Sequence, residues 1–232
     1  MKWEVPQEWR GQTCVIIAGG PSLGDERRRM YSYDLTELAY ARLTQEPEPR
    51  IITVNDSWRL FPMADVFYFC DASWWHQQCA SNRRTVDGLE NFTRAANRGF
   101  WVTAGPQPPD HPRVHALNLT GQRGMEDNPR AMRHGSNSGY QAIHLAAHYG
   151  AKKIILLGFD MKPAADGRTH WHAESRPAQF DQTVANFLSH FPSLAAPLVQ
   201  RGIEVINATP DSALKVWPCK TLQEALALKL KV

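Results

Sequence analysis

A chain of 232 residues with 43% hydrophobic and 21% charged side chains is too ordinary in composition for a disordered protein, and we expect one α/β domain over residues 1–232. Its net charge of +3 does not indicate nucleic-acid binding, and no run approaches the roughly 18 apolar residues of a membrane span. The N-terminus lacks an apolar leader segment, and four scattered cysteines signal neither zinc nor disulfides, so we expect a reducing, cytoplasmic compartment.

The first predicted strand, residues 13–18, ends abruptly in a glycine turn. This turn contains Gly19, Gly20, Pro21 and Ser22. Glycines let the backbone approach a phosphate or ribose closely, and a serine there can cap a short helix or donate to a ligand. A plain strand-to-helix turn uses the same residues, so the motif by itself is weak.

Two further strands, residues 51–54 and 66–69, also end in polar side chains. Asn55 follows the first of them and Asp71 follows the second. Because the carboxyl ends of parallel strands meet at one edge of a sheet, these clusters point to one ligand site, although strand-to-helix turns favour Asn, Asp and Ser anyway. Between the strand at residues 13–18 and the strand at residues 51–54, residues 34–43 predict an amphipathic helix capped by Asp34, with Leu43 on its apolar face.

The next segment, about residues 74–98, turns polar and basic. It is either an exposed excursion over a substrate or a helix on the sheet, and we prefer a helix for residues 88–97. Residues 100–103 predict a fourth strand and residues 114–117 a short fifth. The loop 121–133 is long enough to suggest function or mobility.

The most informative stretch is residues 133–160. Asn137, Ser138 and Gly139 open a helix, and a helix N-terminus is a ready anion site. The apolar run 153–157 predicts a strand buried on both faces, which ends in Gly158 and Asp160. On the helix between them, His144 and His148 stand at i and i+4, and we expect a partly exposed face.

The loop at about residues 161–177 carries His170 and His172 around Trp171. We expect a mobile lid in which Trp171 shields a substrate from water. Period-two geometry places both rings on one side. Four interpretations of the two histidines are open: a general base, a phosphate contact, a metal pair, or solvated loop histidines. Further on, residues 178–201 predict two helices or one broken at Pro192, residues 203–206 the last strand, and residues 222–228 a final helix.

These elements together predict a Rossmann-like, doubly wound, mostly parallel sheet of six or seven strands, with helices on both faces. The motifs that carry this prediction also resemble a group of known families. They are I-I-A-G-G-P-S-L, the N-D strand end, G-S-N-S-G-Y, I-I-L-L-G-F-D and I-E-V-I-N-A-T-P-D-S-A-L, over roughly residues 13–218. The group comprises the MptE-like 6-hydroxymethylpterin diphosphokinases, the Maf flagellin glycosyltransferases and the bacterial sialyltransferases that use a CMP-sugar. The chain is also similar to small bacteriophage proteins with a T-H-W-H segment.

The resemblance to the sialyltransferases implies a nucleotide-sugar donor and a set of contacts for it. The implied nucleotide-binding residues are Gly19, Gly20, Pro21, Ser22, Asn55, Asp71, Asn137, Ser138, Gly139, Gly158 and Asp160. His170 or His172 corresponds to their catalytic lid histidine. One departure is Gly135, which stands where they have an arginine, although Arg133 lies nearby.

Three functions stay open at this stage. A nucleotide-sugar glycosyltransferase would use a loop histidine to deprotonate an acceptor, which the sequence does not identify. A diphosphokinase of the MptE type would need Mg²⁺, for which Asp71 and Asp160 are the available oxygen ligands. A non-catalytic nucleotide-binding module would need no base. A homo-oligomer is compatible with all three.

Overall fold

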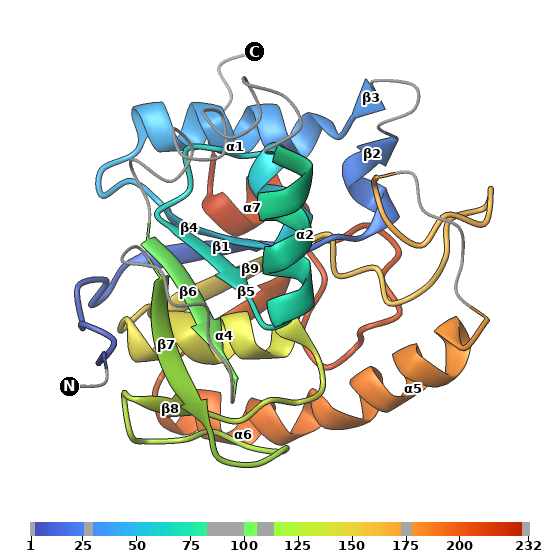
Figure 1. The fold of residues 1–232 in the computed structure, drawn as a ribbon. Coiled ribbons are helices and arrows are strands. Elements are labelled where there is room, and N and C mark those ends of the chain that lie inside the picture. The colour runs from blue at the N-terminus through green and yellow to red at the C-terminus, as the bar shows by residue number, and fades with distance from the viewer. Residues whose placement is uncertain (1–2, 26–29, 83–99, 106–113, 173–177, 229–232) are drawn as a thin grey trace.

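The computed structural model describes residues 3–25, 30–82, 100–105, 114–172 and 178–228. The helix expected at 88–97 and the connection between the fourth and fifth predicted strands, residues 106–113, lie outside these ranges. Within them, eight strands form one sheet in the order β10-β9-β1-β4-β5-β6-β7-β8, and each pair of neighbours runs parallel (Figure 1). The strands are β1 (Thr13–Ile17), β4 (Arg50–Val54), β5 (Val66–Phe69), β6 (Phe100–Ala104), β7 (Val114–Leu119), β8 (Ala131–Met132), β9 (Lys153–Leu157) and β10 (Glu204–Asn207). The predicted fold class is confirmed.

Helices cover both faces of this sheet, as the predicted class requires (Figure 1). They are α1 (Tyr33–Thr44), α2 (Ala72–Asn82), α4 (Ser138–His148), α5 (Phe180–His190), α6 (Pro192–Gln200) and α7 (Leu222–Leu226). Two short 3-10 turns, η1 (Pro21–Leu23) and η3 (Asn55–Arg59), follow β1 and β4, and β2 (Gly24–Asp25) pairs antiparallel with β3 (Met30–Tyr31). None of the helices in the described ranges combines the length and apolarity needed to cross a bilayer.

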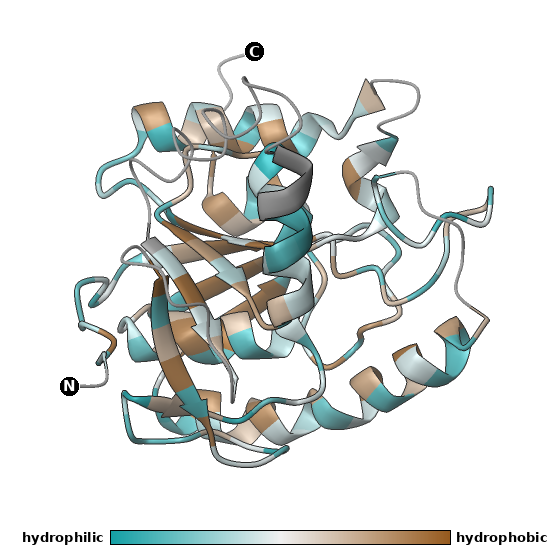
Figure 2. Cartoon of the chain, viewed as in Figure 1, coloured by the Kyte–Doolittle hydropathy of each residue, from teal (hydrophilic) through white to brown (hydrophobic). Residues whose placement is uncertain are grey.

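The strand side chains alternate between two hydrophobic cores, one on each face. In β1, Cys14 and Ile16 join the core under α4 and α6, whereas Val15 and Ile17 join the core under α1 and α7. This alternation follows from the period of two along a strand, and it explains why the central strands are apolar throughout. Figure 2 shows those strands as hydrophobic and the outer helix faces as mixed.

Several expected boundaries differ from the observed ones. The cap of α1 is Ser32, whose hydroxyl accepts from the Asp34 N–H, so Asp34 lies in the first turn. Leu43 is 81% exposed and does not belong to the buried face of α1. Residues 131–132 of the expected loop form β8, a strand too short to leave an alternating pattern, and α7 ends at Leu226 because Ala227 turns left-handed.

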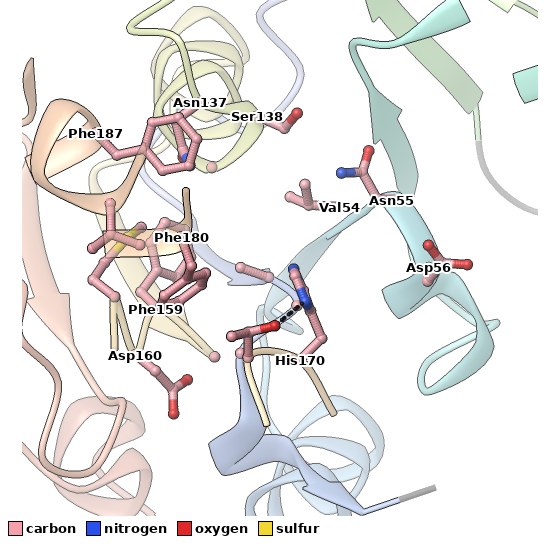
Figure 3. A pocket seen from close by; sticks show the side chains of 18 of the residues that line it. Val54, Asn55, Asp56, Asn137, Ser138, Phe159, Asp160, His170, Phe180 and Phe187 are labelled. Carbon is pink, nitrogen blue, oxygen red and sulfur yellow. Dashed lines mark hydrogen bonds between the residues drawn. The ribbon is translucent and has the colours of Figure 1, made fainter. Parts of the chain in front are cut away.

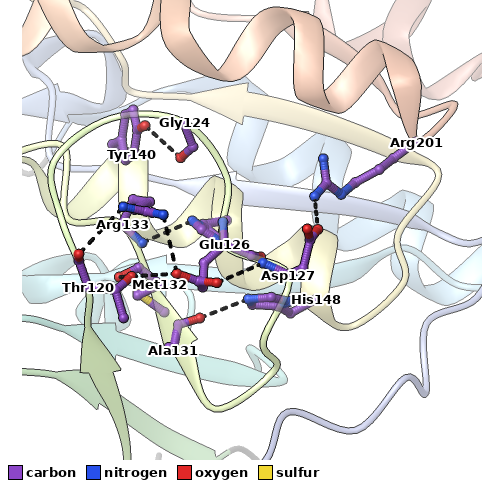
Figure 4. A network of polar contacts seen from close by, with 11 residues as sticks. Thr120, Gly124, Glu126, Asp127, Ala131, Met132, Arg133, Tyr140, His148 and Arg201 are labelled. Carbon is purple, nitrogen blue, oxygen red and sulfur yellow. Dashed lines mark hydrogen bonds and ion pairs between the residues drawn. The ribbon is translucent and has the colours of Figure 1, made fainter.

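The loop 121–133 is held by buried contacts from one face of α4. Tyr140 donates from its hydroxyl to the Gly124 carbonyl at 2.9 Å, and His148 contacts the Ala131 carbonyl at 2.9 Å (Figure 4). His144 accepts from the Glu126 N–H at 3.0 Å. His144 and His148 are therefore buried, which corrects the expected partly exposed helix face. Their contacts fix the chain that leads into the start of α4.

Acid should unfold the protein through His144 before its carboxylates titrate. Burial, followed by the nearby His148, lowers the pKa of His144 to about 3, and protonation would add a proton to the one ring nitrogen that accepts from a backbone N–H. Because the pKa of His144 is lower in the folded state than in the unfolded state, the stability that neutral His144 contributes is complete above pH 6.5. It is lost as pH falls toward 3. We expect the free energy of unfolding to drop by about 2 kcal/mol between about pH 7 and pH 5.

Urea denaturation across this pH range measures the effect. His144→Gln removes the titration of His144 and should make the pH dependence shallower, with the buried His148, whose pKa is also lowered by burial, supplying part of what is left. His76 is exposed on α2, so His76→Gln should keep the wild-type slope. Equal slopes for wild type and His144→Gln would rule out His144 as the group responsible.

Candidate functional site

A cavity of about 410 Å³ opens at the carboxyl ends of the central strands. The chain leaves β1 toward β4 on one side, whereas β9 and β10 lie on the other side, so the strand order reverses between β1 and β9. Open α/β sheets bind their ligands outside such a switch point. The cavity is the natural ligand site of this fold.

Most of the residues predicted for the site line this one cavity. Those that do are Gly19, Gly20, Asn55, Asp71, Asn137, Ser138, Gly139, Gly158, Asp160, His170 and His172. They come from the ends of β1, β4, β5 and β9, from the start of α4 and from the loop after β9. Pro21 and Ser22 are not among the lining residues.

In place of the expected ligand contact, Ser22 binds Asp160. The Ser22 N–H and hydroxyl donate to the two carboxylate oxygens of Asp160 at 2.9 Å and 2.8 Å. A Cβ on Gly20 would lie only 1.8 Å from one of these oxygens, so the glycine is required by this contact. Burial raises the pKa of Asp160, and the Ser22 hydrogen bonds oppose that shift. Asp160 thus closes the turn after β1 against the end of β9.

The start of α4 leaves two backbone donors at the cavity. Asn137 caps the helix by accepting from the Tyr140 N–H at 3.0 Å. Within the described part of the chain, the N–H groups of Ser138 and Gly139 donate to no protein acceptor. A Cβ on Gly139 would lie 2.7 Å from the Phe159 ring, so the close packing of α4 against the turn after β9 needs glycine here. The positive end of the helix dipole faces the cavity.

Three non-glycine residues at the cavity have a left-handed backbone. They are Asn55 (φ 50°), Ser136 (φ 54°) and Met161 (φ 51°). Such conformations cost free energy and gather at functional sites. Among the described residues, the buried Asn55 side-chain oxygen accepts no hydrogen bond, and Figure 3 shows this side chain directed toward the cavity. Asn55 therefore lines the cavity with its side chain, while the side-chain oxygen itself is buried.

His170 and His172 lie side by side at the cavity, as the period of two predicts. Their ring centroids are 5.1 Å apart and the rings are stacked. Trp171 between them points the other way into the core and is fully buried, and its backbone N–H donates to the Gly19 carbonyl at 3.2 Å. The expected shield over a substrate is thus an anchor, since an indole in the core fixes both histidines. Residues 173–177 of the expected lid lie outside the described residues.

The two histidines have different neighbours. The His170 ring lies 3.3 Å from the position of a Cβ on Gly19, against the glycine turn. The His172 Nε2 lies 4.0 Å from an Asp56 carboxylate oxygen. Asp56 is itself held by Trp74, which donates from its indole N–H at 2.9 Å, and by Gln78, which donates from its side-chain amide at 3.1 Å.

Sequence reasoning did not assign Asp56, Lys162 or the wall formed by α5. Asp56 stands in a polar strand end, but only the folded loop brings His172 to it. Lys162 lines the cavity next to Asp160 and pairs with Asp211. Phe180, Val184 and Phe187 of α5 line the cavity with apolar side chains. The i, i+4, i+7 spacing of this last set is the one signal that the sequence carries, and it also fits a helix packed on a sheet.

Comparisons with known proteins find a remote structural likeness. No family model and no curated protein matches the chain. Two similar structures are of the sialyltransferase CstII from Campylobacter jejuni, one with cytidine-5'-monophosphate and one with CMP-3FNeuAc. Both are 14% identical to this chain. The match to the first has a TM-score of 0.44 and covers 90% of this chain and 85% of the sialyltransferase chain. The match to the second has a TM-score of 0.43 and covers 89% of this chain and 84% of the sialyltransferase chain. Likeness at this level defines neither a ligand nor an activity for the chain.

Proposed function

We propose that this protein is a nucleotide-dependent transferase of the nucleotide-sugar glycosyltransferase type. The observation that supports it most is that free helix N–H groups, a glycine turn and a pair of histidines meet in one cavity at the switch point of the sheet. Anion-binding backbone and a base near neutral pH are what the transfer of a group from a phosphate requires.

The donor phosphate would bind between the glycine turn and α4. The N–H groups of Ser138 and Gly139 would donate to its oxygens, and the helix dipole favours its negative charge. Gly19 and Gly20 leave room for it, with His170 beside them as a further donor. Asn55 would contact the base or ribose through its side-chain amide at the edge of the cavity.

His172 would act as the base of the transfer step. Its imidazole takes the proton from an acceptor hydroxyl while that oxygen forms a bond to the anomeric carbon of the donor sugar. The bond from this carbon to the phosphate oxygen breaks, and the electron pair leaves on the nucleotide phosphate. Asp56 would orient the ring and stabilise the imidazolium that forms.

The diphosphokinase alternative fits the residues less well. Mg²⁺ would need Asp71 and Asp160, but both carboxylate oxygens of Asp160 already accept from Ser22, and the expected pair therefore offers only Asp71 freely. A non-catalytic nucleotide-binding module would use the same backbone donors. It would leave the contact between His172 and Asp56 without a role.

Nucleotide binding should raise the thermal stability. At a concentration of roughly 100 times Kd, a nucleotide that binds the native state adds about 2.7 kcal/mol, or a Tm increase of about 5–10 °C in a chain of this size. Differential scanning fluorimetry would compare CMP, UDP, GDP and ATP, with and without Mg²⁺, and the corresponding nucleosides as matched controls. The nucleosides should shift Tm much less because they lack the phosphate. The proposal fails if no nucleotide shifts Tm.

A further inference from the structure

The cavity has two unlike walls. Asn55, Asp56 and His170 stand on one side, and Phe159, Phe180 and Phe187 stand on the other (Figure 3). The polar wall accounts for the nucleotide and the base of the proposed function. The apolar wall has no part in either.

The apolar wall belongs to α5, which presents one apolar face. Phe187 and Leu188 near its C-terminal end pack against the hydrophobic core. Val184 and Phe180, one and two turns closer to the N-terminus, face the cavity instead, and each is half-buried. The residues between them on the helix, such as Thr183, are exposed. The N-terminal half of α5 therefore turns its apolar face to the ligand site.

This wall favours a ligand with an apolar group. Water against half-buried Phe and Val side chains is unfavourable, and a ligand that covers them removes apolar surface from water at both partners. A nucleotide phosphate has nothing to gain there, and it has the start of α4 to bind. In the proposed function, the other ligand of this cavity is the acceptor, whose hydroxyl His172 would deprotonate.

We propose that the acceptor carries an aryl or branched alkyl group beside its reactive hydroxyl, and that this group packs against Phe180, Val184 and Phe187. The proposal rests on the proposed function, which makes His172 the base for that hydroxyl. The occupant is a small molecule, because the wall is one side of a cavity of about 410 Å³.

Matched pairs of probes test the proposal. Phenyl and methyl β-glycosides of glucose, galactose and mannose differ only in the apolar group, and their Kd values can be measured by ligand-observed NMR with and without CMP, UDP, GDP and ATP. We expect the phenyl member of at least one pair to bind about tenfold more tightly, the gain from covering one ring face. Equal binding within every pair, or no binding of any probe, overturns the proposal.

Two neighbouring substitutions locate the effect on α5. Val184→Asp places a charge on the wall and should reduce the preference for the phenyl probe to about twofold or less. Thr183→Asp makes the same change at the next, exposed position and should leave the preference intact. Phe180→Ala is a second variant away from the core contacts of Phe187 and should lower the preference severalfold. A preference unchanged in Val184→Asp and in Phe180→Ala would place the apolar group elsewhere.

The probes separate this inference from the function on which it rests. A phenyl preference without any nucleotide-induced rise in Tm would keep the apolar wall and overturn the proposed transferase. A nucleotide-induced rise in Tm that Val184→Asp preserves, together with equal binding of phenyl and methyl probes, would overturn only the inference that the acceptor packs against α5.

Discussion

His172→Ala should lower turnover by about 10²–10⁴-fold at saturating substrate, the usual contribution of a positioned general base. Nucleotide affinity should change little, because His172 lies at Asp56 and not at the glycine turn. His170→Ala should do the reverse and weaken nucleotide binding, since His170 stands against Gly19. The measurement is steady-state transfer, with the Kd for nucleotide determined separately.

Controls distinguish a base from a structural residue. Asp56→Asn should lower turnover by about tenfold or more and leave nucleotide binding intact, because Asp56 lies at His172 and not at the glycine turn. The exposed His76 lies on α2, and His76→Ala should retain wild-type kinetics. If His172→Ala and Asp56→Asn both turn over at the wild-type rate, the base assignment is wrong.

Gly20→Ala should abolish nucleotide binding and also destabilise the fold. The backbone of Gly20 is extended, with φ of −67°, so the cost is steric and not conformational. The added Cβ would lie 1.8 Å from the Asp160 carboxylate and 2.5 Å from the Gly158 carbonyl. Asp160 would have to leave Ser22, and we expect the free energy of unfolding to fall by about 2–4 kcal/mol. Urea denaturation and nucleotide titration give the two quantities.

Gly105→Ala is a matched control for that loss. Among the described residues, a Cβ on Gly105 would meet only the Cys70 carbonyl, at 3.7 Å, which is an ordinary contact. This variant should stay within about 0.5 kcal/mol of wild type. Comparable losses in the two variants would mean that the contact between Gly20 and Asp160 is not what limits stability.

The sheet could be predicted because its strands are short apolar runs that end in polar turns. The boundaries predicted from those runs for β1, β4, β5, β9 and β10 agree with the structure to within one residue. The same turns contain most of the residues predicted for the cavity. Local pattern carries this information because strand ends of a parallel sheet share one edge. It does not show which polar side chain faces a ligand and which binds another residue. Ser22 and Asp160 were both expected to contact the nucleotide, and they contact each other.

Burial of polar residues was the second limit. His144 and His148 look like the exposed side of a helix, since histidines at i and i+4 suit a solvated face. They are buried because the loop 121–133 folds over α4 and supplies backbone partners. Trp171 is a second example, because this aromatic side chain belongs to a polar loop and yet reaches the core. Both outcomes depend on tertiary contacts of segments without a regular pattern.

The position of β1 has a consequence for how the protein is made. β1 is made before the other strands of this sheet, yet it stands between β4 and β9, and its Thr13 pairs with Lys153. Contacts between residues so distant in sequence form slowly, because a long loop must close first. Until β9 arrives, β1 keeps an unpaired apolar edge, which is a hazard for aggregation during synthesis. The cavity between β1 and β9 is therefore completed late, and a nascent chain stalled before residue 153 would carry most of the sheet and no ligand site.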